Sequence, residues 1–174
     1  MRRVVVTGMG LITSLGTGLE ENWINLISGK SGIKKIDSFD ITDLPSKIAG
    51  YIPKEALDNT FDDRDKRKMD NFILYSLIAS SEAVKQSGCS PKNDEEASRS
   101  GVIVGSGIGG LSTIYENSIL LDKTNSKKIS PFFIPSSLIN LASGQISIKF
   151  NFKGPNHSIV TACSSGAHAI GDSF

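Results

Sequence analysis

The sequence predicts an α/β fold with a layered, mixed and mostly parallel sheet. Short apolar or β-branched runs occur at 2–7 (RRVVVT), 101–105 (GVIVG) and 157–162 (HSIVTA), and helical patterns separate them. Continuous apolar runs of this length are typical of strands that are buried on both faces. Because strands that alternate with helices pair in parallel through crossover connections, this order favours a sheet with helices on its faces.

The helical patterns lie between and after these strands. The clearest covers residues 71–87, where apolar residues repeat at helical spacing from Phe72 to Ala83 and Gly88 follows as a stop. A helix is also expected to begin at Cys163. Further helices are predicted at 20–28, 111–121 and 136–150, and residues 30–65, rich in Asp, Pro and Gly, are predicted to form a long surface excursion.

Composition and charge exclude several classes of protein. The 174 residues carry 19 basic and 18 acidic side chains, so a net charge of +1 predicts partners that are neither nucleic acid nor membrane. No apolar run approaches the roughly 20 residues of a spanning helix. The first residues indicate a strand and not a signal peptide. The two cysteines, Cys89 and Cys163, have neither metal-ligand nor disulfide spacing, so we expect no metal site and a reducing, cytoplasmic location.

Cys163 is the candidate nucleophile. It follows the predicted strand 157–162 and opens a run of small residues from Ser164 to Ala167. Unpaired backbone N–H groups and the helix dipole at such a position favour the thiolate, the reactive form of cysteine. A similar strand–turn–helix presents the serine nucleophile of many hydrolases. These residues alone leave an equal alternative, in which Cys163 is a small buried hydrophobic side chain.

Neither histidine is well placed to serve Cys163 as a base. His168 lies five residues further on, about 140° around a helix, and therefore points away from the sulfur. His157 lies on the preceding strand and cannot easily return to it. We expect structural roles for both histidines, and an inert role for Cys89, which lies in a polar loop beyond a helix end.

The turn Gly105–Gly110 (GSGIGG) satisfies the G-x-G-x-x-G pattern between a strand and a helix, which is the setting of a dinucleotide fingerprint. The fingerprint also needs an acidic residue at the end of the next strand, about 20 residues on. Here the following segment, LLDKTNSKKISP, is basic and loop-like. A tight turn beside another backbone or a different ligand is the favoured interpretation. A nucleotide-dependent oxidoreductase remains the alternative.

Several motifs follow one another in a recognisable order. The segment Thr161–Gly166 (TACSSG) ends a series made up of Val4–Gly10, Gly29–Ile33, Arg67–Phe72, Gly105–Leu111, Lys128–Ser136 and Gly154–Pro155. Each motif is modest alone, but in register and ending on the cysteine they are specific. The whole chain resembles the β-ketoacyl-[acyl-carrier-protein] synthases, the condensing enzymes of fatty-acid synthesis. Ile108 and Phe133 resemble the pattern of the elongating members.

The resemblance implies a thiolase-like fold of two duplicated α/β halves, with residues 1–174 forming an incomplete first half. It implies a decarboxylative Claisen condensation, in which Cys163 holds the acyl chain as a thioester and malonyl carrier protein supplies two carbons. No cofactor is implied. The catalytic histidines and helper lysine of such enzymes belong to the second half. We therefore expect the chain to be the N-terminal part of a longer protein and to be inactive alone.

The resemblance also implies a pocket, a partner and an assembly. Ile108 and Phe133 would line the acyl pocket, with Phe133 from the same or the partner subunit, and Gly107 would let the pocket approach the backbone. Acyl carrier protein, which is acidic, would dock on basic residues at the pocket entrance, and the full-length protein would be a homodimer. A non-catalytic homologue that only binds carrier protein is the remaining alternative. The basic residues assigned to docking are Arg67, Lys68, Lys127 and Lys128.

Overall fold

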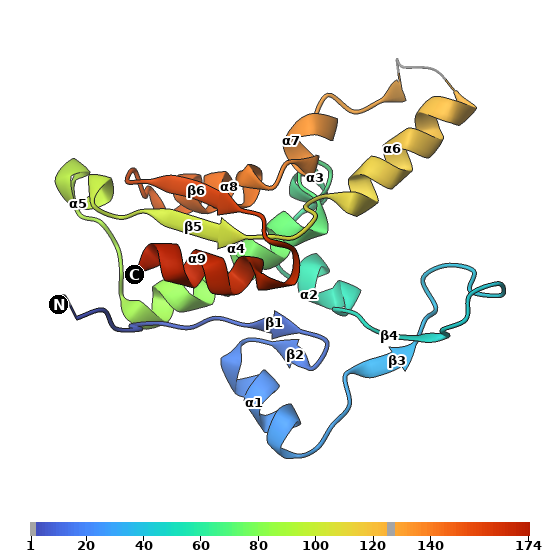
Figure 1. The fold of residues 1–174 in the computed structure, drawn as a ribbon, viewed down its shortest axis with the longest axis horizontal. Coiled ribbons are helices and arrows are strands. Elements are labelled where there is room, and N and C mark those ends of the chain that lie inside the picture. The colour runs from blue at the N-terminus through green and yellow to red at the C-terminus, as the bar shows by residue number, and fades with distance from the viewer. Residues whose placement is uncertain (1–2, 125–127) are drawn as a thin grey trace.

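The computed structural model describes residues 3–124 and 128–174, and its centre is a pair of parallel strands. Strand β5 (Val102–Gly105) pairs with β6 (Asn156–Ile159) over four positions, from Val102 opposite Asn156 to Gly105 opposite Ile159. Figure 1 shows the two arrows side by side, with the final helix along the β5 side of the pair. Both strands therefore end at the same edge of the pair.

Helices cover the two faces of this pair, and the alternation of side chains along β5 separates them. Val102 and Val104 pack into the main core, together with helices α4 (Asn71–Ser87) and α8 (Asn140–Phe150). Ile103 lies with Ala169 of α9 (Ser165–Ser173) on the other face. The buried core consists of Ile73, Leu77, Val102, Ala142, Ile146 and Phe152.

The other elements surround this centre (Figure 1). They are β1 (Ile12–Thr13), β2 (Gly16–Thr17), α1 (Leu19–Ile27), β3 (Ile33–Lys35), β4 (Ile48–Gly50), α2 (Lys54–Asp58), α3 (Asp63–Lys66), α5 (Asp94–Ser98), α6 (Leu111–Lys123), α7 (Phe133–Ser137), η2 (Ala162–Ser164) and α9 (Ser165–Ser173). Strands β1 and β2 form one antiparallel pair and β3 and β4 another.

Several predictions from the sequence are confirmed. Helix α4 has the predicted bounds, and Gly88 ends it in the left-handed region with φ of 68°. Helices α1 and α6 differ from their predicted bounds by one or two residues. The excursion 30–65 is largely at the surface, although it contains the β3–β4 hairpin and the short helices α2 and α3.

The predicted strand 2–7 is wrong for its described residues, since residues 3–10 form no strand. Val4, Val5 and Val6 are 51%, 66% and 79% exposed. The segment instead runs past α4, where a Cβ at Gly8 or Gly10 would overlap carbonyl oxygens of that helix. An apolar run indicates that burial of the segment is favourable. It does not show that a neighbouring strand is present to pair with it.

Side chains of α4 hold this segment and the residues that follow it. Gln86 Oε1 accepts a hydrogen bond from Met9 N at 2.6 Å. The two carboxylate oxygens of Glu82 accept from Leu11 N at 2.9 Å and from Leu19 N at 2.7 Å. Helix side chains thus satisfy backbone donors that a sheet would otherwise pair.

The predicted helix 136–150 is divided in two. Helix α7 ends at Ser137, Leu138 is extended with ψ of 134°, and α8 begins at Asn140. The carbonyl oxygen of Ser137 accepts a hydrogen bond from Gly110 N at 3.0 Å. This contact with the glycine turn competes with continuation of the helix, and periodicity along the chain cannot reveal it.

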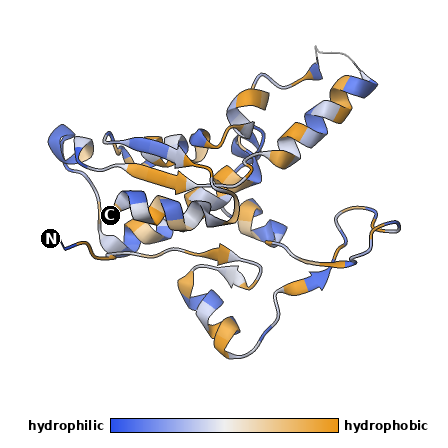
Figure 2. Ribbon diagram, in the orientation of Figure 1, coloured by the Kyte–Doolittle hydropathy of each residue, from blue (hydrophilic) through white to orange (hydrophobic). Residues whose placement is uncertain are grey.

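The predicted third strand is also shifted, because β6 starts at Asn156 and ends at Ile159. Figure 2 shows the contrast with β5, which is hydrophobic along its length whereas β6 is mainly hydrophilic. Asn156 and His157 are exposed. Within residues 3–124 and 128–174, β6 pairs only with β5, so its outer edge carries unpaired backbone groups. None of the helices in the same residues is long and apolar enough to cross a membrane.

Replacing Glu82 by Ala is expected to lower the free energy of unfolding by about 1–3 kcal/mol, because two backbone donors lose a charged acceptor. Lys85→Ala, at an exposed position of the same helix, is the control and should change stability little. Urea unfolding of both variants measures the difference. Equal stability of the two variants would contradict the role given to Glu82.

Candidate active site

Cys163 lies in the η2 turn between β6 and α9, and its side chain is exposed. The predicted strand–turn–helix is confirmed, although α9 begins at Ser165 and not, as predicted, at Cys163. The alternative of a buried hydrophobic side chain is wrong for this structure. The residue before it, Ala162, has φ of 48°, in the left-handed region that residues other than glycine rarely adopt. This conformation turns the chain sharply from the strand toward the helix.

Ser165 holds the turn in place from inside, and it is a residue that the sequence analysis missed. It is only 3% exposed. Its Oγ accepts a hydrogen bond from Thr161 N at 2.9 Å and donates to the carbonyl oxygen of Ala162 at 2.7 Å. A serine in the first turn of a helix can hydrogen-bond backbone groups three or four residues earlier, and this local pattern could have identified it.

The glycine turn packs directly against the cysteine turn. A Cβ at Gly105 would overlap the carbonyl oxygen of Ser165, and one at Gly107 would lie 3.3 Å from the carbonyl oxygen of Ala162. Ser106 N donates to the carbonyl oxygen of Ile159 at 3.1 Å. These contacts give the glycines a role between two protein backbones, as the tight-turn interpretation expects, and the dinucleotide alternative gains no support.

Ile108 and Phe133, predicted to line one pocket, do lie on one groove of about 640 Å³ in the same chain. Val160, three residues before Cys163, also lines it, whereas Gly107 and Cys163 do not. Ile108 is 65% exposed, so the groove is open to solvent. The remaining lining residues are Ile114, Ile134, Ser137, Leu138, Ile139, Asn140 and Ser158. The groove is thus mainly apolar and reaches the strand that leads to the cysteine.

The basic residues differ in their surroundings. Arg67 and Lys128 are exposed, and Lys127 lies outside the described residues. Lys68 Nζ lies 5.5 Å from the centre of the Phe132 ring, next to the groove residue Phe133. The structure therefore brings Lys68 to the border of the groove. It does so through a cation–π contact between the segment that follows α3 and the N-cap residue of α7.

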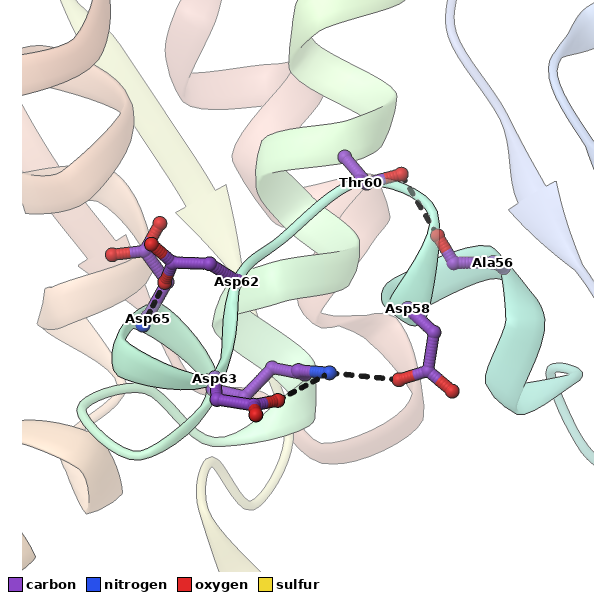
Figure 3. Close-up of polar contacts among 7 residues, drawn as sticks. Ala56, Asp58, Thr60, Asp62, Asp63 and Asp65 are labelled. Carbon is purple, nitrogen blue, oxygen red and sulfur yellow. Dashed lines mark hydrogen bonds and ion pairs between the residues drawn. The ribbon is translucent and has the colours of Figure 1, made fainter.

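Lys66 forms ion pairs with two nearby aspartates, Asp58 and Asp63, which Figure 3 labels. Its Nζ lies 2.8 Å from Asp58 Oδ1 and 3.1 Å from Asp63 Oδ1. The pKa of Lys66 is raised, mainly by its hydrogen bond to Asp58 and next by its hydrogen bond to Asp63. Asp62 caps the same short helix by accepting from Asp65 N at 2.8 Å. These contacts give Lys66 a local structural role, and it is not one of the four residues assigned to docking.

The histidines make other contacts. His168 Nδ1 lies 3.4 Å from Thr161 Oγ1, and its Nε2 lies 3.6 Å from Asp172 Oδ1. His157 is exposed on β6. His168 thus braces the segment before Cys163 instead of approaching the sulfur.

Asp70 is the second residue that the sequence analysis missed. It is 8% exposed and lies before α4, where its carboxylate accepts from Thr113 N at 2.9 Å and from Thr113 Oγ1 at 2.7 Å. Burial raises the pKa of Tyr75, and the negative charge of Asp70 raises it further. An aspartate directly before a long helix is a capping signal. The contact with Thr113 could not be predicted from local sequence, because Thr113 lies 43 positions from Asp70 along the chain.

Comparison with known proteins places this geometry in a family. The sequence pattern described as "Beta-ketoacyl synthase, N-terminal domain" matches residues 1–174. The chain belongs to the β-ketoacyl synthase family. It is 48% identical to the 3-oxoacyl-[acyl-carrier-protein] synthase 2 of Rhizobium meliloti and 42% identical to the mitochondrial 3-oxoacyl-[acyl-carrier-protein] synthase of Arabidopsis thaliana. These matches cover 99% and 98% of this β-ketoacyl synthase chain, but 42% and 41% of the relatives.

Solved structures agree with the thiolase-like α/β fold. A β-ketoacyl synthase from Burkholderia phymatum superposes with a TM-score of 0.79 at 26% identity, over 100% of this chain and 43% of that one. A ketosynthase bound to the hexaketide, in complex with its type II PKS acyl-carrier protein, gives a TM-score of 0.70 at 25% identity. That match covers 99% of this chain and 47% of the other. The chain thus spans less than half of each of these relatives.

Gly105→Ala is expected to destabilise the protein by about 1–3 kcal/mol, because the added methyl group overpacks against the Ser165 carbonyl. It should also displace the start of α9 and change the rate at which Cys163 reacts with a small alkylating agent. Thermal unfolding and alkylation rates measure the two effects.

Gly166→Ala provides the matched control, because nothing lies within 4 Å of a Cβ at this helical position. It should be neutral or stabilise by up to about 1 kcal/mol. If the two variants behave alike, the close approach of the two turns does not position the cysteine.

Proposed function

We propose that this chain is part of a 3-oxoacyl-[acyl-carrier-protein] synthase of fatty-acid biosynthesis, with Cys163 as its nucleophile. The observation that carries the proposal is the exposed cysteine on a sharp turn before α9, in a chain of the β-ketoacyl synthase family. The names of the R. meliloti and A. thaliana relatives support the same reaction and substrate class.

The reaction has two stages. In the first, the Cys163 thiolate attacks the carbonyl carbon of an acyl thioester on the carrier protein, and the carrier thiol leaves. In the second, malonyl carrier protein loses carbon dioxide, and the resulting carbanion attacks the acyl–cysteine carbonyl. The new carbon–carbon bond lengthens the chain by two carbons, and the Cys163 thiolate is released. No external oxidant, reductant or cofactor is needed.

The groove described above is the proposed site for the acyl chain. Its lining by Ile108, Phe133 and Val160 gives an apolar surface that leads toward the cysteine turn. Gly107 contributes by letting the glycine turn approach the Ala162 carbonyl. Residues outside this chain, by resemblance two histidines and a lysine, would assist decarboxylation. The 174 residues alone are therefore proposed to be inactive in condensation.

Cys163 is expected to react selectively with an acyl-like electrophile of the cerulenin type, since it lies at the strand–helix turn whereas Cys89 follows the end of α4. One equivalent of reagent and peptide mapping by mass spectrometry identify the adduct. Cys163→Ser should abolish labelling, and Cys89→Ser is the control that should retain it. Modification mainly at Cys89 would overturn the assignment. Carrier binding without labelling or turnover would favour the non-catalytic homologue.

We further propose that acyl carrier protein docks at the groove entrance, on Arg67, Lys68, Lys127 and Lys128. The contact of Lys68 with the Phe132 ring supports this position, because it places positive charge beside the groove. The similar ketosynthase that was solved with an acyl-carrier protein supports the class of partner. Positive charge at this rim attracts an acidic carrier, chiefly by raising the association rate.

Reversing Lys127 and Lys128 to Glu in the full-length enzyme is expected to raise KM for acyl carrier protein substrates, more at low salt than at high salt, because salt screens rim charges. Acyl coenzyme A or small acyl thioesters should be affected much less. Steady-state kinetics at two ionic strengths make the comparison. Equal losses on both substrate types, independent of salt, would show that these lysines do not recognise the carrier.

A homodimer in the cytoplasm is proposed for the full-length protein. The outer edge of β6, free of a partner strand within residues 3–124 and 128–174, supports the dimer because a second copy could pair there. Sedimentation of the full-length protein should give twice the monomer mass at micromolar concentration. A monomer at all concentrations would contradict the proposal.

A further inference from the structure

One carboxylate caps two helices at once. Asp70 is the N-cap of α4, where its Oδ1 accepts from Phe72 N at 3.4 Å. Its Oδ2 accepts from Thr113 N, the third residue of α6. The N-cap of α6 is Gly110, which has no side chain to perform this role. Asp70 therefore supplies, from another helix, the acceptor that α6 lacks.

The surroundings of Asp70 favour a fixed geometry. The group is buried, and the two helix N-termini direct positive ends of their dipoles toward it. The Thr113 hydroxyl adds a third donor at 2.7 Å. No ion pair of Asp70 with a basic side chain is found in residues 3–124 and 128–174, so its charge is balanced by these hydrogen bonds and dipoles.

Three walls of the groove meet at this carboxylate. Ile114, the residue after Thr113, lines the groove from α6, and Ile108 lines it from the glycine turn. A Cβ at Gly110 would lie 3.3 Å from Asp70 Oδ2 and 2.7 Å from the Cα of Ser137, so the turn is held between Asp70 and α7. Helix α7 carries the third wall through Phe133.

We propose that Asp70 is a positioning residue that sets the acyl-chain preference of the groove, by fixing α6 and the glycine turn relative to α7 through its contact with Thr113. This inference rests on the proposed function of the groove. Asp70 does not touch the reacting atoms, and the effect is transmitted through Ile108 and Ile114. A long acyl chain depends on all three walls, whereas a short one depends mainly on the cysteine turn.

The test uses the full-length enzyme and Thr113→Val, which removes the hydroxyl donor but keeps the backbone N–H and the shape of the side chain. Thr113→Ser keeps the hydroxyl and is the rescue variant. Ser118→Ala is the matched control on the same helix, because Ser118 Oγ donates to a backbone carbonyl within α6 and, in residues 3–124 and 128–174, forms no hydrogen bond with Asp70. Asp70→Asn is a fourth variant that removes the charge. Acylation of Cys163 is measured with carrier protein that bears either a long or a short acyl chain. Alkylation of Cys163 is measured with iodoacetamide.

Loss of one hydrogen bond, worth about 1 kcal/mol, should lower the ratio of long-chain to short-chain acylation about fivefold in Thr113→Val. Asp70→Asn should lower it at least as much where it folds. Thr113→Ser and Ser118→Ala should keep the wild-type ratio, and iodoacetamide should react at the wild-type rate throughout.

An unchanged ratio in folded Thr113→Val would overturn the proposal. So would equal losses on both chain lengths and on iodoacetamide, which indicate a general structural role. These results differ from a failure of the proposed function, in which the wild-type enzyme itself forms no acyl–Cys163.

Discussion

Parallel pairing of β5 with β6 is the constraint on which the site depends. Because both strands run in the same direction, their carboxyl ends meet at one edge, although long stretches of sequence separate them. The glycine turn follows the end of β5, and the cysteine turn follows the end of β6. Their backbones are close enough that only glycine fits at position 105. An antiparallel arrangement would have placed the two turns at opposite ends.

The elements that local sequence determines were predictable. Helix α4 follows from its apolar spacing and from the glycine that ends it, and both are local properties. The valines at 4–6 were misassigned because their pattern indicates an extended chain but not its neighbours. The break at Leu138 also escaped prediction, since it depends on a hydrogen bond from Gly110, which comes from a distant part of the sequence.

The same distinction applies to the site. Cys163 could be found from the small residues around it and from its place after a strand, and the pairing of Ile108 with Phe133 came from resemblance to a family. Ser165 and Asp70 were missed for different reasons. Ser165 makes local contacts whose signal was overlooked, whereas the role of Asp70 depends on Thr113, which joins it only in the folded chain.

The attachment of the first residues to α4 has a consequence for variation in this family of sequences. Glu82 and Gln86 bind main-chain N–H groups, which every residue except proline provides. Substitutions at positions 9, 11 and 19 should therefore be accepted in evolution as long as proline is avoided. Change at position 82 should be rare, because one side chain there serves two distant backbone sites.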